Sequence, residues 1–234
     1  MKFGAFAAGT VAAGCVAAVS GVLPAAAEDA APASLYEAAL QDLAQHDGAV
    51  SQVCGFVADL QGEESASYRF DADRPEGRRW VNAEEAVADP AETGLPDEGA
   101  TLVRVSDSMF TGREAPRYVG RSDGLAVFAF DPVEVEISGM GQSVDIAEHV
   151  RSEVGIDPQT GRFAYVRLYA PDSFKPHPVA RFREFETRVD IGQAWEGGPL
   201  VRVRAQNDMV ISAMFQTHDI ANAQTYSGFR PCAG

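Results

Sequence analysis

The chain has few basic residues, and this scarcity excludes several kinds of partner. Only 19 of its 234 residues are Lys or Arg, against 34 Asp or Glu, so the formal net charge at pH 7 is −15. Nucleic acids and anionic membrane surfaces repel a protein with this excess of negative charge. We therefore expect no nucleic-acid partner, and at most a peripheral association with a membrane.

The sequence also lacks the motifs of the common enzyme classes. It contains no Gly-x-Ser-x-Gly, no phosphate-binding loop, no His-Glu-x-x-His and no closely spaced cysteine pair. Its four histidines are far apart in sequence, and Asp71-Ala72-Asp73 is not followed by the later ligands of a calcium loop. We therefore expect a non-catalytic protein without metal or cofactor; a hydrolase with an unfamiliar site is the enzymatic alternative.

The first 27 residues have the three parts of a secretory signal peptide. Lys2 is the only charged residue before Glu28, the segment 3–23 is apolar or small, and a small-x-small site ends at Ala27. This pattern predicts cleavage near Ala27, export to the periplasm and a mature chain of residues 28–234. Two alternatives stay open: an uncleaved membrane anchor, and lipid attachment at Cys15.

Export would place the two remaining cysteines, Cys54 and Cys232, in an oxidising compartment. Such a compartment favours a disulfide between them, with two free thiols as the alternative. The bond would close a loop of almost the whole mature chain. The absence of Cys-x-x-Cys argues against a redox enzyme.

Hydrophobic periodicity predicts one helix followed by many strands. The helix is capped by Ser34, carries apolar residues at helical spacing from Leu35 to Leu43, and ends at Gly48. A second, short helix is expected at 83–88. The predicted strands are 50–57, 65–70, 101–105, 117–120, 125–130, 150–156, 162–169, 179–191, 200–205, 209–217 and 224–229.

Two turns support this pattern: Asp123-Gly124, and the segment 157–161, each lying between strand-like runs. The predicted fold class is mainly β (α+β), with one β-rich domain over residues 28–234. We expect a curved antiparallel β-meander or an open half-barrel packed against the N-terminal helix.

Aromatic and arginine side chains recur along the predicted strands. At period two, one face would carry Phe163, Tyr165, Arg167 and Tyr169, and another would carry Arg181, Arg183 and Phe185. One interpretation is pairing of the arginines with acidic residues across strands. The other is a groove in which aromatics hold the apolar part of a ligand and arginine meets an anionic head group. The candidate ligand-binding residues are Phe128, Phe130, Phe163, Tyr165, Tyr169, Phe182, Phe185, Arg181 and Arg183.

Two stretches carry a family resemblance. The segment 70–80, Phe-Asp-Ala-Asp-Arg-Pro-Glu-Gly-Arg-Arg-Trp, resembles a strand-ending turn of exported bacterial proteins of unassigned function. The segment 155–163, with its Asp-Pro-Gln-Thr-Gly turn, resembles a hairpin of the LolA-like superfamily, which includes periplasmic lipoprotein carriers and lipid-sensing domains of envelope-stress regulators. The resemblance implies an open, curved antiparallel sheet with helices on its concave side, which binds acyl chains.

The chain departs from the lipoprotein carriers in having one clear helix, a long acidic loop between Trp80 and Gly99, and cysteines near both ends of the domain. We expect a periplasmic binding protein with an apolar cavity for an acyl chain or similar amphipathic ligand, acting as a lipid or lipoprotein carrier or sensor. The alternative is a cell-envelope module that binds another envelope protein and no small ligand.

Overall fold

The computed structural model describes residues 32–62, 64–88, 93, 95–139, 142–213 and 216–232. The predicted signal peptide, with Cys15, lies outside them. The strands are β1 Val53–Gln61, β2 Ala66–Asp71, β3 Trp80–Asn82, β4 Arg117–Ser122, β5 Leu125–Phe130, β6 Glu136–Gly139, β7 Gln142–Asp145, β8 Arg151–Asp157, β9 Arg162–Tyr169, β10 Phe174–His177, β11 Ala180–Gln193, β12 Leu200–Ala213 and β13 Gln216–Pro231. The helices are α1 Pro32–His46 and α3 Ala100–Val103, with the 3₁₀ helices η1 Asp47–Gln52, η2 Asp107–Phe110 and η3 Ala147–His149.

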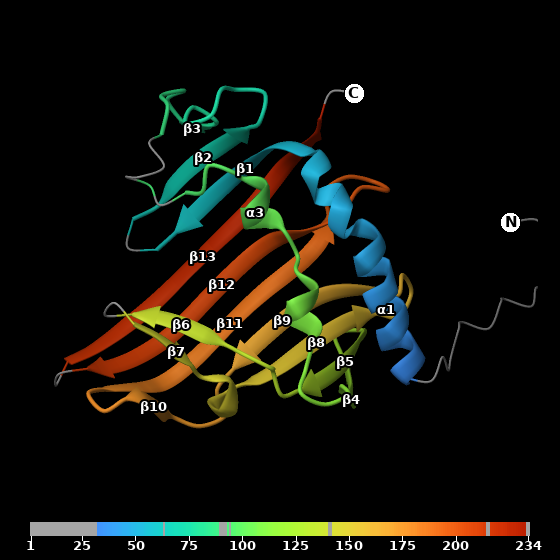
Figure 1. Cartoon of the computed structure of the whole chain (residues 1–234), viewed down its shortest axis with the longest axis vertical. Coiled ribbons are helices and arrows are strands. Elements are labelled where there is room, and N and C mark those ends of the chain that lie inside the picture. The colour runs from blue at the N-terminus through green and yellow to red at the C-terminus, as the bar shows by residue number, and fades with distance from the viewer. Residues whose placement is uncertain are drawn as a thin grey trace, which may run out of the picture.

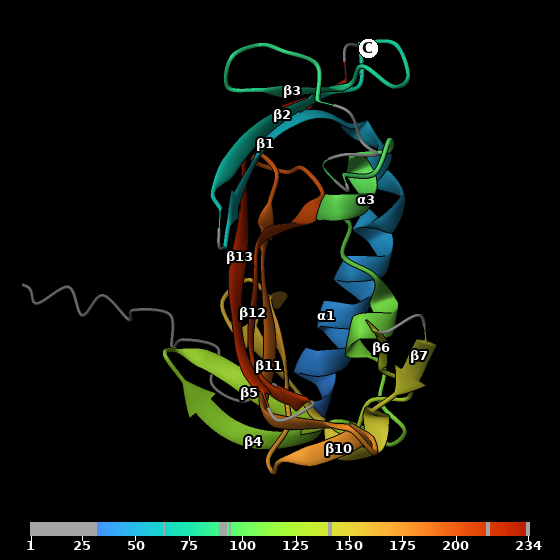
Figure 2. The same ribbon diagram turned by 90° about the vertical axis from the view of Figure 1, so that its left-hand side faces the viewer.

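Within these residues, eleven strands form one open antiparallel sheet, ordered β3-β2-β1-β13-β12-β11-β9-β8-β5-β4 with β10 on β11. The strands β4, β5, β8, β9, β11, β12 and β13 lie side by side in chain order as a meander, and β1 then pairs with β13. Figure 2 shows the sheet curving, with β1 and β2 arching over α3. The helices α1 and α3 and the separate hairpin β6–β7 all lie on the concave side (Figures 1 and 2). The predicted mainly-β class, with an open curved sheet against a helix, is confirmed.

Helix α1 packs on the sheet through one apolar stripe. Tyr36, Ala39 and Leu43, at helical spacing, are buried. The Tyr36 ring lies edge-on to the rings of Phe128 and Phe163, with centroids 5.2 Å and 5.6 Å away. The predicted helix is therefore confirmed, and it begins two residues before Ser34, at a proline that suits the first helical position.

Three apolar clusters build the core on the concave side. The helix cluster lies beneath α1 and includes Tyr36, Leu43, Phe110, Phe128, Phe130, Phe163, Val166 and Val189. The arch cluster lies beneath β1–β3 and includes Val53, Phe56, Phe70, Trp80, Val103, Val201 and Tyr226. The hairpin cluster lies beneath β6–β7 and includes Ile146, Val150, Phe174, Phe182 and Phe185, with Val135, Ile137, Val144 and Leu168 packed against it.

Cys54 and Cys232 form a disulfide, as predicted. Their Cα atoms are 4.8 Å apart although 178 positions separate them in sequence. The Cys232 N–H also donates to the carbonyl of Gln52, at 2.8 Å. The bond therefore fastens the start of β1 to the end of β13. Among the helices described, none is long and apolar enough to cross a membrane.

Two local predictions were wrong. Residues 101–105 were expected to be a strand, but Ala100–Val103 is one helical turn whose Val103 is fully buried under the arch. Residues 83–88 were expected to be a helix, but they form a turn. The Asn82 side chain accepts from the N–H groups of Glu84 and Ala86, both at 3.0 Å, and holds the chain out of helical geometry.

The strands also extend further than their hydrophobicity indicated. The segments 200–205 and 209–217 were expected to be two strands, but β12 runs without a break from Leu200 to Ala213. β13 begins at Gln216 rather than at 224. The polar residues 206–208 of β12 remain in the ladder because β11 and β13 pair with them from both sides.

Candidate functional site

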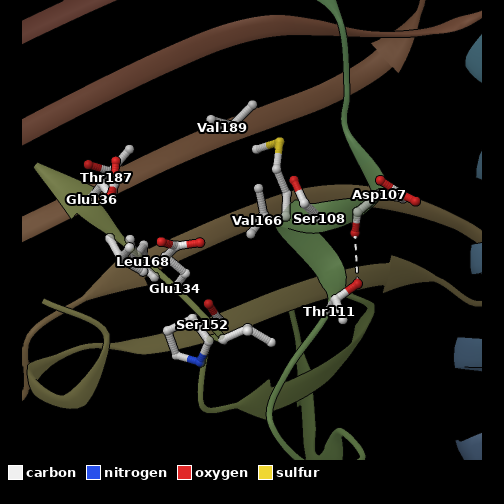
Figure 3. Close-up of a pocket in the computed structure, with 14 residues that line it drawn as sticks. Asp107, Ser108, Thr111, Glu134, Glu136, Ser152, Val166, Leu168, Thr187 and Val189 are labelled. Atoms are coloured by element: carbon white, nitrogen blue, oxygen red, sulfur yellow. Dashed lines mark hydrogen bonds between the residues drawn. The ribbon is translucent and has the colours of Figure 1, made fainter. Parts of the chain in front are cut away.

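A cleft of about 760 Å³ opens on the concave side, between the helix cluster and the hairpin cluster. Its floor comes from three adjacent strands: Ser152 of β8, Val166 and Leu168 of β9, and Thr187 and Val189 of β11 (Figure 3). Its volume falls in the range of small-molecule sites. Most of this floor is aliphatic.

Two segments that leave the sheet form the walls of the cleft. One wall is η2 and the residue after it, with Asp107, Ser108, Met109 and Thr111. The other is the extended segment that leads into β6, with Pro132, Val133, Glu134, Val135 and Glu136. Figure 3 shows side chains from both walls above the strands of the floor.

Hydrogen bonds fix both walls to the rest of the molecule. The Tyr36 hydroxyl of α1 donates to the carbonyl of Phe110 at 2.5 Å, and burial raises the pKa of this tyrosine. In the other wall, one carboxylate oxygen of Asp145 accepts from the N–H groups of Val135 and Ala147, at 3.0 Å and 2.9 Å. These two backbone donors, Ala147 first, lower the pKa of Asp145. The walls are therefore held in place without any ligand.

Ser152 is a buried hydroxyl on the floor of the cleft. It exposes 3% of its surface, and among the residues that the structure describes it is the one polar side chain in the fully buried class. In this part of the chain its hydroxyl has no hydrogen-bond partner, and it faces the cleft beside Glu134 and Leu168 in Figure 3. The hydroxyl oxygen is not among the side-chain atoms sealed from solvent without a partner, so it opens onto the cleft and can bond to whatever enters.

The charge on the cleft is of one sign. Its lining includes the exposed carboxylates of Asp107, Glu134 and Glu136, and no Lys, Arg or His occurs among the lining residues described. Two cations lie beside the walls: Arg202, whose Nη2 is 3.8 Å from the sulfur of the wall residue Met109, and Arg113, which acts electrostatically on Asp145 behind Val135. Burial lowers the pKa of Arg202.

A polar ladder leads from the cleft across the sheet. The Thr187 hydroxyl donates to the side-chain oxygen of Asn207 at 2.9 Å, and the amide of Asn207 donates to that of Asn222 at 2.8 Å. The three residues lie at paired positions on β11, β12 and β13. A polar strip therefore crosses β11, β12 and β13 beside the floor of the cleft.

Five of the predicted ligand-binding aromatics are core residues beside the cleft. Phe128, Phe130 and Phe163 belong to the helix cluster, where Phe110 stacks on Phe163 with centroids 4.0 Å apart. Phe182 and Phe185 belong to the hairpin cluster, at 6% and 5% exposure. None of the five lines the cleft.

The expected alternation along β9 was wrong. A register shift between Gly155 and Ile156, opposite residues 163–165, interrupts it. Phe163 therefore packs in the core, while Tyr165 and Tyr169 lie on the opposite, convex face. There the Tyr165 hydroxyl donates to Glu153 at 2.9 Å, and desolvation, more than this bond, raises the pKa of Tyr165 to about 12.

The expected shared face of Arg181, Arg183 and Phe185 was also wrong. A register shift between Phe182 and Glu184 turns the Phe185 ring into the hairpin cluster. Arg181 donates to Ser173 at 2.9 Å. Tyr169, Arg183 and Phe185 line a second, smaller cavity of about 330 Å³.

Two arginines of the convex face bond to acidic residues, Arg167 across strands and Arg188 along its own strand β11. Arg167 bonds to Glu186 at 2.7 Å, and this bond raises the pKa of Arg167. Arg188 bonds to Asp190 at 2.8 Å and lies over the ring of Tyr165, 4.1 Å from its centroid. These guanidinium groups already have protein partners.

Sequence reasoning did not find the cleft residues. Ser152, Glu134 and Glu136 carry no motif, and they come together only because the segment before β6 folds back over β8 and β9. No group of three or more His, Cys, Asp or Glu side chains in the described chain could hold a metal ion. Comparison with protein-family models, with curated proteins and with solved structures found no match for this chain. The likeness to the LolA-like superfamily therefore remains a prediction.

Proposed function

We propose that this chain is an exported, non-catalytic binding protein of the cell envelope that holds the apolar part of an amphipathic ligand in its concave-side cleft. The observation that carries this proposal is the aliphatic floor of Val166, Leu168 and Val189, which lines a cleft between two packed clusters of the concave face. A ligand with an acyl chain could cover these side chains and remove apolar surface from water.

Export to the periplasm rests on the segment 1–27 and on the Cys54–Cys232 disulfide, which suits an oxidising compartment. N-terminal sequencing of the protein recovered from cells tests the segment. A chain beginning at Glu28 is expected. A chain beginning at Met1, or at a lipid-modified Cys15, would contradict cleavage at Ala27.

Native mass spectrometry of the purified protein, followed by solvent extraction, tests binding. We expect one co-purified or added acyl-chain ligand per chain, as a lipid or lipoprotein carrier or sensor requires. Thr187→Phe would fill the cleft and abolish binding. Thr225→Phe is the matched control. Thr225 pairs with Arg204 and Asp59, and it lies three positions from Asn222, which shares the cleft-side face with Thr187, so its side chain is on the opposite face of the sheet. Absence of uptake by the parent protein would contradict the proposal.

A second candidate is a protein-interaction module that uses the edge of the sheet. β4 is an end strand of the sheet order, and its Tyr118 and Val119 are 40% and 49% exposed. An envelope protein could add a strand there. A protein that takes up no amphiphile, yet loses a specific partner upon Val119→Pro, would favour this function over the first.

A further inference from the structure

The cleft has features that select the polar part of its ligand as well as the apolar part. The following inference rests on the proposed function and concerns the same site. The walls carry three carboxylates and no cationic side chain, while Arg167 and Arg188 on the convex face are already paired with carboxylates.

The hydroxyl of the buried residue Ser152, which opens onto the cleft, supplies a second, independent observation. Ser152 lies on the floor at 3% exposure, and no residue of the described chain satisfies its hydroxyl. A hydroxyl oxygen accepts hydrogen bonds as readily as it donates them. An N–H donor on the ligand would satisfy Ser152, and a hydrocarbon placed there would not.

The three carboxylates stand on the walls, where they could hold the positively charged group of a ligand whose apolar part lies on the floor. Glu134 and Glu136 are two positions apart on an extended segment, so their side chains project to one side, while Val135 between them packs in the hairpin cluster. Asp107 stands on the facing wall, hydrogen-bonded to Thr111 through its own carbonyl at 3.2 Å (Figure 3). In the described chain none of the three carboxylates forms an ion pair.

We infer that the ligand is an amphipathic cation: an apolar chain on Val166, Leu168 and Val189, with a protonated amine that bonds to Ser152 and is held by Glu134, Glu136 and Asp107. The amine supplies side-chain-type N–H donors that the lining lacks, since no lining side chain described carries a nitrogen. An anionic head group would meet three like charges instead. Arg202 does not reverse this preference, because Met109 and not Arg202 lines the cleft.

The test compares three probes with the same twelve-carbon chain and different head groups: dodecylamine, dodecanoate and dodecyl maltoside. Each is titrated calorimetrically into the full-length protein below its micelle concentration, at pH 7. We expect dodecylamine to bind one per chain and about tenfold more tightly than dodecanoate, as two or three exposed ion pairs would give. This preference should shrink in high salt.

Two variants assign the preference to the cleft. Glu134→Gln with Glu136→Gln should remove most of it. Glu37→Gln with Glu76→Gln, exposed sites on α1 and on the turn after β2, changes the net charge equally and should leave it intact. Ser152→Ala should weaken dodecylamine binding about three- to tenfold without lowering the melting temperature, because the lost hydroxyl has no partner in the free protein.

The outcomes separate the inference from the function on which it rests. If none of the three probes binds one per chain, the binding function itself fails. If dodecanoate or the maltoside binds as tightly as dodecylamine, the binding function stands and the cationic ligand is overturned. Equal loss of preference in both double variants would also overturn it, since a general charge effect would then suffice.

Discussion

The ring of Tyr165 lies across Gly155 on the neighbouring strand, so closely that a Cβ atom at position 155 would come within 2.2 Å of Tyr165 Cε1. The two residues are paired in the β8–β9 register, next to the shift that reverses the faces of β9. The absence of a side chain at Gly155 therefore leaves room for the Tyr165 ring on the convex face. The next residue of β9, Val166, then faces the floor of the cleft.

Gly155→Ala should lower the free energy of unfolding by about 1–3 kcal/mol, the range for overpacked sites. Gly62→Ala is the control, because its nearest neighbour would be 3.7 Å away, and it should be neutral or slightly stabilising. Both are measured by urea unfolding. Tyr165→Ala in the Gly155→Ala protein should recover part of the loss in a double-mutant cycle. Equal effects of the two glycine variants would contradict the close packing.

Replacing Cys54 and Cys232 together by serine should cost about 5 kcal/mol, because the bond closes a loop of 178 positions in the unfolded chain. Urea unfolding with and without a thiol reductant measures the effect. The reductant should destabilise the parent protein by a similar amount and leave the double variant unchanged. A parent protein insensitive to a reductant that cleaves the bond would show that the loop closure contributes nothing.

Stability should fall in alkaline solution from about pH 10 upward. Tyrosine titrates near pH 10 in an unfolded chain, whereas burial raises the pKa of Tyr36 and raises that of Tyr165 to about 12. Above pH 10 the unfolded chain loses these protons before the folded one, so unfolding becomes more favourable as pH rises. Chemical denaturation between pH 8 and 12 measures the slope.

Tyr36→Phe should reduce the fall of stability with alkaline pH, because it removes one phenol whose pKa is raised in the folded protein. At neutral pH it should also cost about 1–2 kcal/mol, because the Phe110 carbonyl loses its hydrogen bond. Tyr165→Phe should reduce the slope as well. The explanation would be wrong if both variants kept the full slope of the parent protein.

Asp145→Ala should loosen the wall that carries Glu134 and Glu136. Hydrogen exchange should accelerate at the amides of Val135 and Ala147, which lose their acceptor. Because the pKa of Asp145 is lowered in the folded protein, the carboxylate keeps both bonds at its ordinary value, and the same loosening should occur in the parent only as pH falls further, through the lowered pKa. Asp172→Ala, on an exposed loop, is the control and should change neither amide.

The parts of the fold that sequence could predict are those fixed by local chemistry. The stripe of Tyr36, Ala39 and Leu43 specifies α1, and the turns at Asp123-Gly124 and Gly161, all with positive φ, specify two hairpins. The pairing of Cys54 with Cys232 could be predicted because they are the two cysteines outside the predicted signal peptide. Each of these features depends on neighbours in sequence or on a single choice of partner.

The site could not be predicted because it depends on register. A single extra residue opposite Gly155 moves Tyr165 away from the cleft and Val166 into it, and no periodicity in the sequence marks that residue. Nothing in the sequence distinguishes Ser152 from other serines in strands; only its pairing with Leu168 in the sheet places it on the floor of the cleft. Asn207 and Asn222 lower the strand signal of their segments, yet they pair with each other across the sheet.

The pairing of β1 with β13 makes completion of the sheet depend on contact between the first and the last strand of the chain. The first strand has an unfilled edge until the last one is available, and the apolar face of the arch, including Phe56 and Trp80, stays open to solvent until Tyr226 arrives. Contacts this distant in sequence slow folding, because a large loop must close before they form. We therefore expect β1, β2 and β3 to complete their packing late in folding, after the local hairpins β4–β5 and β8–β9 have formed.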